Sequence, residues 1–181
     1  MGLHARLPLR DADMGEAMTH ADLVARAARW LANTRRCSVV ATERNAWGAG
    51  EAPDAIGWTC YGHSVLVECK TTVADFYSDQ RKPGRRAGSL GMGRERFYLT
   101  PEGLLAGKYL PDGWGLLELR GRSVRVIAHA AVRVDPHATC REAPLLVAIV
   151  RRGLDGRFPG LLAGARALPD AGCVVTGRTG A

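Results

Sequence analysis

Two acidic residues and one lysine stand where they could act together on a phosphodiester. Asp54 follows Pro53, while Glu68 and Lys70 close an apolar, β-branched run that begins at Ser64. Side chains alternate between the faces of a strand, so Glu68 and Lys70 project from one face, roughly 6 to 7 Å apart along the chain. A carboxylate there can hold a cation while the ammonium contacts a water or phosphate oxygen. The spacing therefore predicts metal-dependent phosphodiester chemistry.

Asp54 is expected to join this pair through a hairpin. It lies fourteen positions before Glu68 (68 − 54 = 14), and residues 61–63 (Tyr-Gly-His) supply a turn between two short strands. Two carboxylates that meet at one point suit Mg²⁺, which keeps several waters and needs only one or two protein carboxylates. We expect Mg²⁺ as the cofactor, with Mn²⁺ as its substitute.

Pro53-Asp54 and Glu68-Cys69-Lys70 have the form of a known nuclease motif, and residues 20–130 resemble the PD-(D/E)XK superfamily. The segments 67–76 and 96–101 are similar to MmcB-related DNA-repair proteins and to small phage and prophage nucleases. The resemblance implies an α/β fold with a restriction endonuclease-like core. In that core a central mixed sheet is flanked by helices, in the order helix, three strands, helix, strand.

The resemblance also implies roles. Asp54 and Glu68 would hold the metal, the backbone carbonyl of Cys69 would complete its shell, and Lys70 would position or deprotonate the attacking water. Glu43, at the end of the preceding strand, is a candidate for an additional metal ligand. The expected activity is Mg²⁺-dependent hydrolysis of DNA by an endonuclease serving repair, recombination or phage DNA processing.

Each of these residues has a purely structural alternative. Asp54 after a proline could cap a helix or form a turn, and Glu68 with Lys70 could be a surface ion pair of little energetic value. Cys69 is favoured as a packed thiol rather than a nucleophile. Glu43 could be a solvated residue at a strand end.

Periodicity predicts the elements that must position these side chains. A capping box of Thr19 and Asp22 begins a helix; this cap role also makes Asp22 a weaker metal candidate than Glu43. The predicted order is helix 19–32, strands 37–42, 55–58 and 65–71, helix 73–80, strands 97–100, 116–119 and 123–128, and helix 141–152 with an apolar stripe of Leu145, Leu146, Ile149 and Val150.

Three further polar residues lie close to these elements. Asp75 and Asp79 share a face of the helix 73–80. They could support the site from behind, but we favour their complementing the positive helix N-terminus. His63 is favoured as a turn or surface residue rather than a catalytic one.

Residues 81–96 form a basic, glycine-containing stretch that cannot bury a core. We predict a mobile loop near the active edge that contacts DNA phosphates; an uncommitted linker is the alternative. The predicted DNA-binding residues are Arg81, Lys82, Arg85, Arg86, Arg94 and Arg96.

Net charge favours a polyanionic partner. The formal charge is +7 with a pI near 9.6, and the three lysines leave 22 arginines among the 25 basic residues. A catalytically silent DNA-binding module on the same scaffold, or a nuclease acting on RNA, are the competing hypotheses.

Length and composition predict one domain at 19–152, a loose lead-in at 1–18 and a peripheral tail at 153–181 that is rich in Gly, Ala and Pro. The five cysteines contain no Cys-x-x-Cys, which favours a reducing cytoplasm over a disulfide framework or zinc ribbon. No run of about 18 apolar residues occurs, so no membrane association is expected. The oligomeric state stays open, and a homodimer is compatible.

Overall fold

The computed structural model describes residues 18–42, 52–82, 91–134 and 136–154. Three helices lie within these ranges: α1 (His20–Asn33), α2 (Val73–Gln80) and α3 (Pro136–Leu154). Almost all of the predicted lead-in and tail lie outside the described residues. No described helix is long and apolar enough to cross a membrane.

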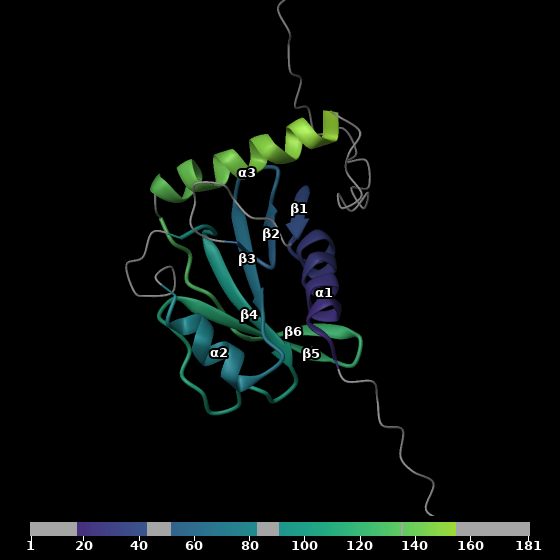
Figure 1. Ribbon diagram of the computed structural model, residues 1–181, viewed down its shortest axis with the longest axis vertical. Helices are drawn as coiled ribbons and strands as arrows, with labels where there is room; N and C mark the ends of the chain where they lie inside the picture. Colours follow the sequence, from purple (N-terminus) through teal and green to yellow (C-terminus); the bar gives the residue numbers. More distant parts are fainter. Residues whose placement is uncertain (1–17, 43–51, 83–90, 135, 155–181) are drawn as a thin grey trace, which may run out of the picture.

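The described strands form one six-stranded sheet in chain order (Figure 1). They are β1 (Val39–Thr42), β2 (Ala55–Trp58), β3 (Ser64–Cys69), β4 (Glu95–Pro101), β5 (Trp114–Arg120) and β6 (Ser123–Ala128). β1, β2 and β3 pair antiparallel, β3, β4 and β5 pair parallel, and β6 returns antiparallel to β5. The predicted α/β class with a mixed central sheet flanked by helices is confirmed.

The helices cover both faces of the sheet, so the fold has three layers with the sheet in the middle. On one face, α1 packs Leu23, Ala27 and Leu31 against Val65 and Val67 of β3. On the other face, Phe76 of α2 and the apolar side of α3 pack against the opposite side chains of β2, β3 and β4. β3 is therefore buried on both faces, as expected of a strand inside a layered α/β fold.

Local sequence signals account for α1. Thr19 adopts an extended backbone before the helix, its hydroxyl accepts the Asp22 N–H, and the Asp22 carboxylate accepts the Thr19 N–H in return. The predicted capping box is confirmed. Hydrogen bonds from the side chain and then the backbone of Thr19 hold the pKa of Asp22 below its ordinary value.

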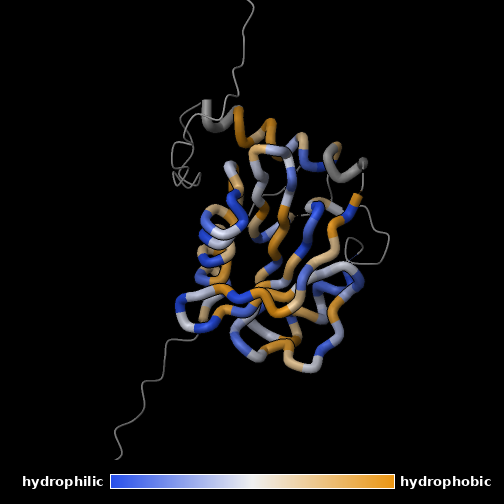
Figure 2. Tube along the Cα trace, turned by 180° about the vertical axis from the view of Figure 1, so that it is seen from behind, coloured by the Kyte–Doolittle hydropathy of each residue, from blue (hydrophilic) through white to orange (hydrophobic). Residues whose placement is uncertain are grey.

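α3 differs most from its prediction, because it begins five residues before the predicted Arg141. Leu145 and Ile149 are buried as the apolar stripe predicts, whereas Val150 is exposed. Glu142 anchors this helix: its carboxylate accepts hydrogen bonds from Trp58 Nε1, Ser64 Oγ and the Gly93 N–H, each at 2.8 Å. Figure 2 shows hydrophobic turns along the middle of this helix.

Gly115 allows β5 to lie directly against Phe97. A Cβ at this position would lie 2.5 Å from Phe97 Cδ1 and 2.7 Å from the Ala128 carbonyl oxygen. We expect Gly115→Ala to lower the free energy of unfolding by about 1 to 3 kcal/mol, because overpacking forces neighbouring groups to shift. Urea denaturation measures this change.

Gly62→Ala is the control, because no atom lies within 4 Å of its added Cβ and it carries only the cost of a positive φ of 73°. A Gly115→Ala protein as stable as the wild type would contradict the packing described for β5.

Candidate active site

The β2–β3 hairpin brings Asp54 to the end of β3, as the sequence spacing predicts. Ala55 pairs with Val67, so the register continued by one residue places Asp54 opposite Glu68. The Asp54 Oδ2 atom accepts the backbone N–H of Cys69 at 2.7 Å. This bond holds one carboxylate of the candidate site beside the other.

Glu68 and Lys70 share one face of β3, and Val65, Val67 and Cys69 lie on the other, in the core beneath α1. The predicted alternation of faces is confirmed. Glu68 is 2% exposed and Lys70 is 8% exposed. The alternative of a solvated surface ion pair is therefore wrong, since both charges are largely removed from water.

The Lys70 ammonium lies between two carboxylates. Its Nζ is 3.5 Å from Glu68 Oε2 and 3.4 Å from Asp79 Oδ1. Asp79 has no exposed surface; its Oδ2 accepts the Tyr98 hydroxyl at 3.0 Å, and its Oδ1 lies 2.8 Å from Lys82 Nζ. Buried charges of opposite sign that are also hydrogen bonded hold one another in place. The position of Lys70 is thus defined by groups from β3, β4 and α2.

Asp75 and Asp79 have different roles, contrary to the shared role that the sequence favoured. Asp75 is exposed in the first turn of α2, whose N-cap is Thr72. Its negative charge there complements the positive end of the helix dipole. Asp79 instead contacts Lys70. A signal was available: Asp79 follows the apolar Phe76 by three positions, so both face the sheet.

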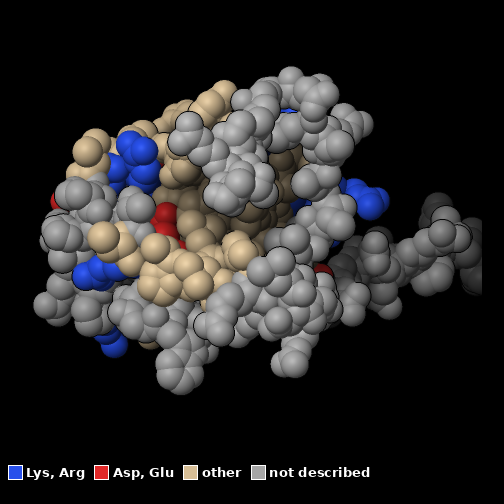
Figure 3. Space-filling model, turned by 90° about the horizontal axis from the view of Figure 1, so that it is seen from above, with Lys and Arg blue, Asp and Glu red and all other residues tan. Residues whose placement is uncertain are grey.

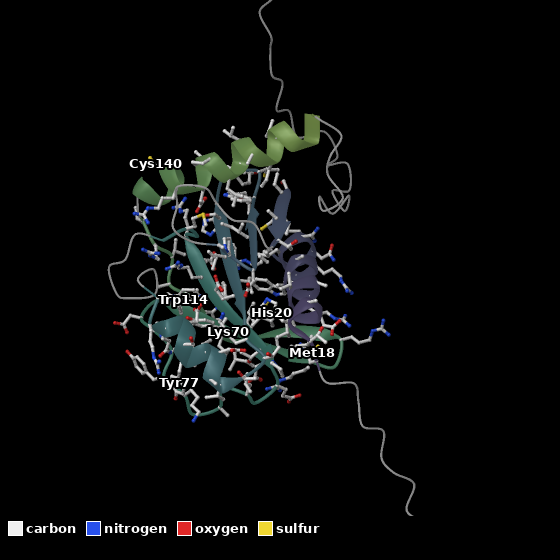
Figure 4. The ribbon with its side chains drawn as sticks, in the orientation of Figure 1. Met18, His20, Lys70, Tyr77, Trp114 and Cys140 are labelled. Atoms are coloured by element: carbon white, nitrogen blue, oxygen red, sulfur yellow. The ribbon has the colours of Figure 1, made fainter. Side chains whose placement is uncertain are left out.

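His20 is a site residue that the sequence reasoning missed. As the first residue of α1 it places Nε2 3.4 Å from Asp54 Oδ1, with its side chain about half exposed (46%). Figure 4 labels His20 at the beginning of α1 and Lys70 near α2. The capping box locates the beginning of the helix. No local pattern, however, relates His20 to Asp54, which lies 34 positions later (54 − 20 = 34).

The oxygen donors at this edge fit a hard cation. Two carboxylates, Asp54 and Glu68, adjoin the backbone of Cys69, and Mg²⁺ binds in such settings with waters completing its shell. Among the described residues no group of three or more His, Cys, Asp or Glu side chains could enclose a metal ion. β1 ends beside the beginning of β2, but Glu43 itself lies outside the described residues.

Two of the described cysteine thiols, Cys69 and Cys37, are packed rather than poised for attack. Cys69 is 1% exposed and belongs to the α1-side core, as predicted. Burial raises the pKa of Cys37 to about 11, with the nearby Arg35 charge opposing the rise. A thiolate nucleophile is disfavoured at Cys37 by its raised pKa, and both thiols are buried away from a substrate.

The predicted basic loop is only partly at the active edge. Arg96 is 2% exposed, with its guanidinium carbon 4.6 Å from the centre of the Trp114 ring, so the prediction that it contacts phosphates is wrong. Arg94 donates its N–H to the Ser64 carbonyl at the beginning of β3. Both residues therefore lie at the opposite edge of the sheet from Asp54, because β3 and β4 run parallel.

Of the other predicted DNA-binding residues, Arg81 and Lys82 are exposed at the end of α2. Lys82 reaches the site through its ion pair with Asp79. Arg85 and Arg86 lie outside the described residues.

His63 belongs to a separate cluster at the far edge. Its Nε2 lies 2.6 Å from Glu95 Oε1, and Arg35 forms an ion pair with the same oxygen. This arrangement agrees with the predicted role of His63 as a residue of the β2–β3 turn.

Comparisons with known proteins establish the fold. No family model matches the chain, and no curated protein matches it. A solved structure, the SPO1766 protein of unknown function from Silicibacter pomeroyi, is similar with a TM-score of 0.58 and 23% sequence identity. The similarity covers 78% of this chain and 94% of that chain. At this identity it concerns the fold alone.

The environment of Lys70 leads to a stability prediction. Lys70→Met removes the cation and leaves Glu68 and Asp79 buried with less compensation, so we expect the free energy of unfolding at pH 7 to fall by about 3 to 5 kcal/mol. Lys108→Met, at an exposed position, is the matched control and should change it by about 0.5 kcal/mol or less.

Adding Glu68→Gln to Lys70→Met should restore part of the lost stability, because the uncompensated charge is removed. Chemical denaturation tests both statements. The proteins compared are the wild type, Lys70→Met, Lys108→Met and the double variant with Lys70→Met and Glu68→Gln. A Lys70→Met protein no less stable than the control variant would contradict the buried arrangement.

Proposed function

We propose that this protein is a Mg²⁺-dependent nuclease that hydrolyses DNA phosphodiester bonds, with a restriction endonuclease-like core of the PD-(D/E)XK superfamily. One observation carries the proposal. Asp54, Glu68 and Lys70 converge at the carboxyl end of β3, with Lys70 Nζ 3.5 Å from Glu68 and the Asp54 carboxylate bonded to the backbone of Cys69. Open α/β sheets bind ligands outside the carboxyl ends of their parallel strands.

The metal would be held by Asp54, Glu68 and the backbone carbonyl of Cys69. When bound, Mg²⁺ supplies Lewis-acid stabilisation of phosphate charge and lowers the pKa of a coordinated water. The two carboxylates alone would repel a phosphodiester, so a cation between them and the substrate also removes an electrostatic barrier. This requirement supports metal-dependent rather than metal-free hydrolysis.

Lys70 would orient the attacking water or a phosphate oxygen. Glu68 and Asp79 hold its ammonium at a defined position, which reduces the entropy lost when water and phosphate are aligned. Lysine can also lose its proton in a suitable environment, whereas arginine in effect cannot. Asp79, which would not touch the substrate, is assigned as a positioning residue, and Tyr98 and Lys82 hold it in turn.

The proposal predicts that the wild type nicks or cuts DNA in Mg²⁺ or Mn²⁺ and that removal of the metal with EDTA abolishes cleavage. Glu68→Gln and Lys70→Met should each reduce the cleavage rate by about 10²- to 10⁴-fold, the usual contribution of a positioned acid or base. Glu102→Gln and Lys108→Met make the same chemical changes at exposed positions and should cleave like the wild type. Gel assays with supercoiled, linear, branched and single-stranded DNA measure the rates, with circular dichroism to verify folding.

Other results would select the competing hypotheses. Tight DNA binding without cleavage under any of these conditions would favour the catalytically silent module. Cleavage of RNA but not DNA would favour a ribonuclease on the same scaffold. Wild-type rates in folded Glu68→Gln would show that the carboxylate assignment is wrong.

Asp79 provides a separate test of positioning. Asp79→Asn keeps the side-chain size but weakens the hold on Lys70, so we expect turnover to fall by about tenfold or more while the Mg²⁺ concentration for half-maximal activity stays unchanged. Tyr98→Phe, which removes only the hydroxyl bonded to Asp79, should show a smaller loss of the same kind. An altered Mg²⁺ requirement with unaltered turnover would contradict the positioning role and place Asp79 with the metal ligands.

A further inference from the structure

A basic groove lies between α1 and the β5–β6 hairpin, away from the face that carries Glu68 and Lys70. Its volume is about 460 Å³, and its lining includes four arginines and no acidic residue. Arg26 and Arg29 come from α1, while Arg122 and Arg125 come from the hairpin. We use "arginine groove" for the surface that these four residues define.

Because no carboxylate among the described residues lines the arginine groove, its four guanidinium groups repel one another. Arg29, Arg122 and Arg125 are exposed, and half-buried Arg26 donates to the Arg122 carbonyl oxygen at 3.5 Å, which joins the helix to the hairpin. Within the described part of the chain, none of the four forms an ion pair with a carboxylate. Asp22, one turn before Arg26 on α1, is hydrogen bonded to Thr19, and the Arg26 charge also helps to lower its pKa. Four like charges, of which only Arg26 has a described carboxylate nearby, are stabilised by a bound anion.

The hairpin side of the arginine groove lies at the same edge of the sheet as the candidate active site. β5 runs parallel to β3 and β4, so its last residue and the hairpin turn lie at the carboxyl edge, where β3 ends. α1 begins at that edge as well, with His20 against Asp54. Figure 1 shows the hairpin beside the first turns of α1. Viewed from above, onto α3, the described Lys and Arg side chains lie in separate places around the rim (Figure 3).

We propose that the arginine groove binds the phosphate backbone of duplex DNA and guides it toward the carboxyl edge of the sheet. Guanidinium groups bind phosphate through two parallel hydrogen bonds, and a row of them along a helix and a hairpin suits a repeating polyanion better than a single small anion. The choice of DNA rests on the proposed function, but the binding itself requires no cleavage. The groove replaces the far-edge residues Arg94 and Arg96 as a path for the backbone.

The test compares two charge-matched double variants. Arg29→Gln with Arg125→Gln removes two charges from the groove, and Lys108→Gln with Arg141→Gln removes two charges from positions outside it. Affinity for a fluorescent DNA duplex is measured by anisotropy over a series of NaCl concentrations, in Ca²⁺ to suppress cleavage. Each lost phosphate contact should flatten the slope of log affinity against log salt by about 0.9 units, so the groove variant should lose about two units and the control little.

Equal losses in both double variants would overturn the proposal, because binding would then follow net charge rather than the groove. An unaltered slope in the groove variant, or no duplex binding by the wild type at low salt, would overturn it too. Polyglutamate and single-stranded RNA are the competing probes. A groove variant that lost polyglutamate binding but kept duplex binding would show an acidic protein partner instead, and a loss confined to RNA would overturn the choice of DNA.

Failure of this proposal is distinguishable from failure of the nuclease proposal. The binding assay in Ca²⁺ requires no cleavage, so a salt slope that depends on the arginine groove would support this proposal even if the wild type cleaves no DNA. If the groove variant cleaved DNA but its slope of log affinity against log salt equalled that of the wild type, the groove proposal alone would be wrong.

Discussion

The Lys70 ammonium, held between the carboxylates of Glu68 and Asp79, is the interaction on which the candidate site depends. Charges this far from water are tolerated only when each has a partner close by. The lysine comes from the end of β3, one acid from the same strand and the other from α2. The helix that follows β3 must therefore return over the same face of the sheet, and Phe76 and Asp79 supply the apolar and the charged parts of that contact.

The two edges of the sheet use acidic residues in different ways. At the carboxyl edge, Asp54 and Glu68 lie beside one another, with Lys70 next to Glu68 and His20 next to Asp54. At the far edge, Glu95 is satisfied by His63 and Arg35. Near that same edge Glu142 receives three hydrogen bonds that attach α3 to the sheet. The far-edge acids are occupied in holding the fold together, whereas Asp54 and Glu68 are the adjacent pair suited to a cation.

Charge is also divided between surfaces. The arginines of α1 and of the β5–β6 hairpin gather on one side, while the carboxylate pair lies at the strand ends. A basic surface attracts a polyanion over distances comparable with the Debye length, about 8 to 10 Å at physiological salt, whereas paired carboxylates repel it at short range. A protein with both features can collect DNA broadly and yet admit a phosphate to the acidic edge only with a cation present. The division of charge thus supports the proposed metal dependence as well as the proposed partner.

Much of the local architecture was determined by the sequence alone. Alternation along residues 64–70 predicted the shared face of Glu68 and Lys70, the Thr19 capping box predicted where α1 begins, and the spacing to Asp54 predicted the hairpin. These features depend on neighbours along the chain, which dihedral preferences and periodicity control directly. The Asp54–Glu68–Lys70 set could therefore be named in advance, while the chemistry assigned to it stays a prediction.

The tertiary structure decided which distant side chains join or leave that set. Asp79 became a partner of Lys70 because α2 folds back over β3, and His20 reached Asp54 because α1 crosses the opposite face with its first turn at the same edge. Arg96, at the end of a basic, glycine-containing stretch of the sequence, was instead buried over Trp114 because it lies in β4, which begins at Glu95. Contacts of this kind form when elements far apart in the chain pack together. Their energy depends on residues that are not neighbours in the sequence, so no local pattern predicts them.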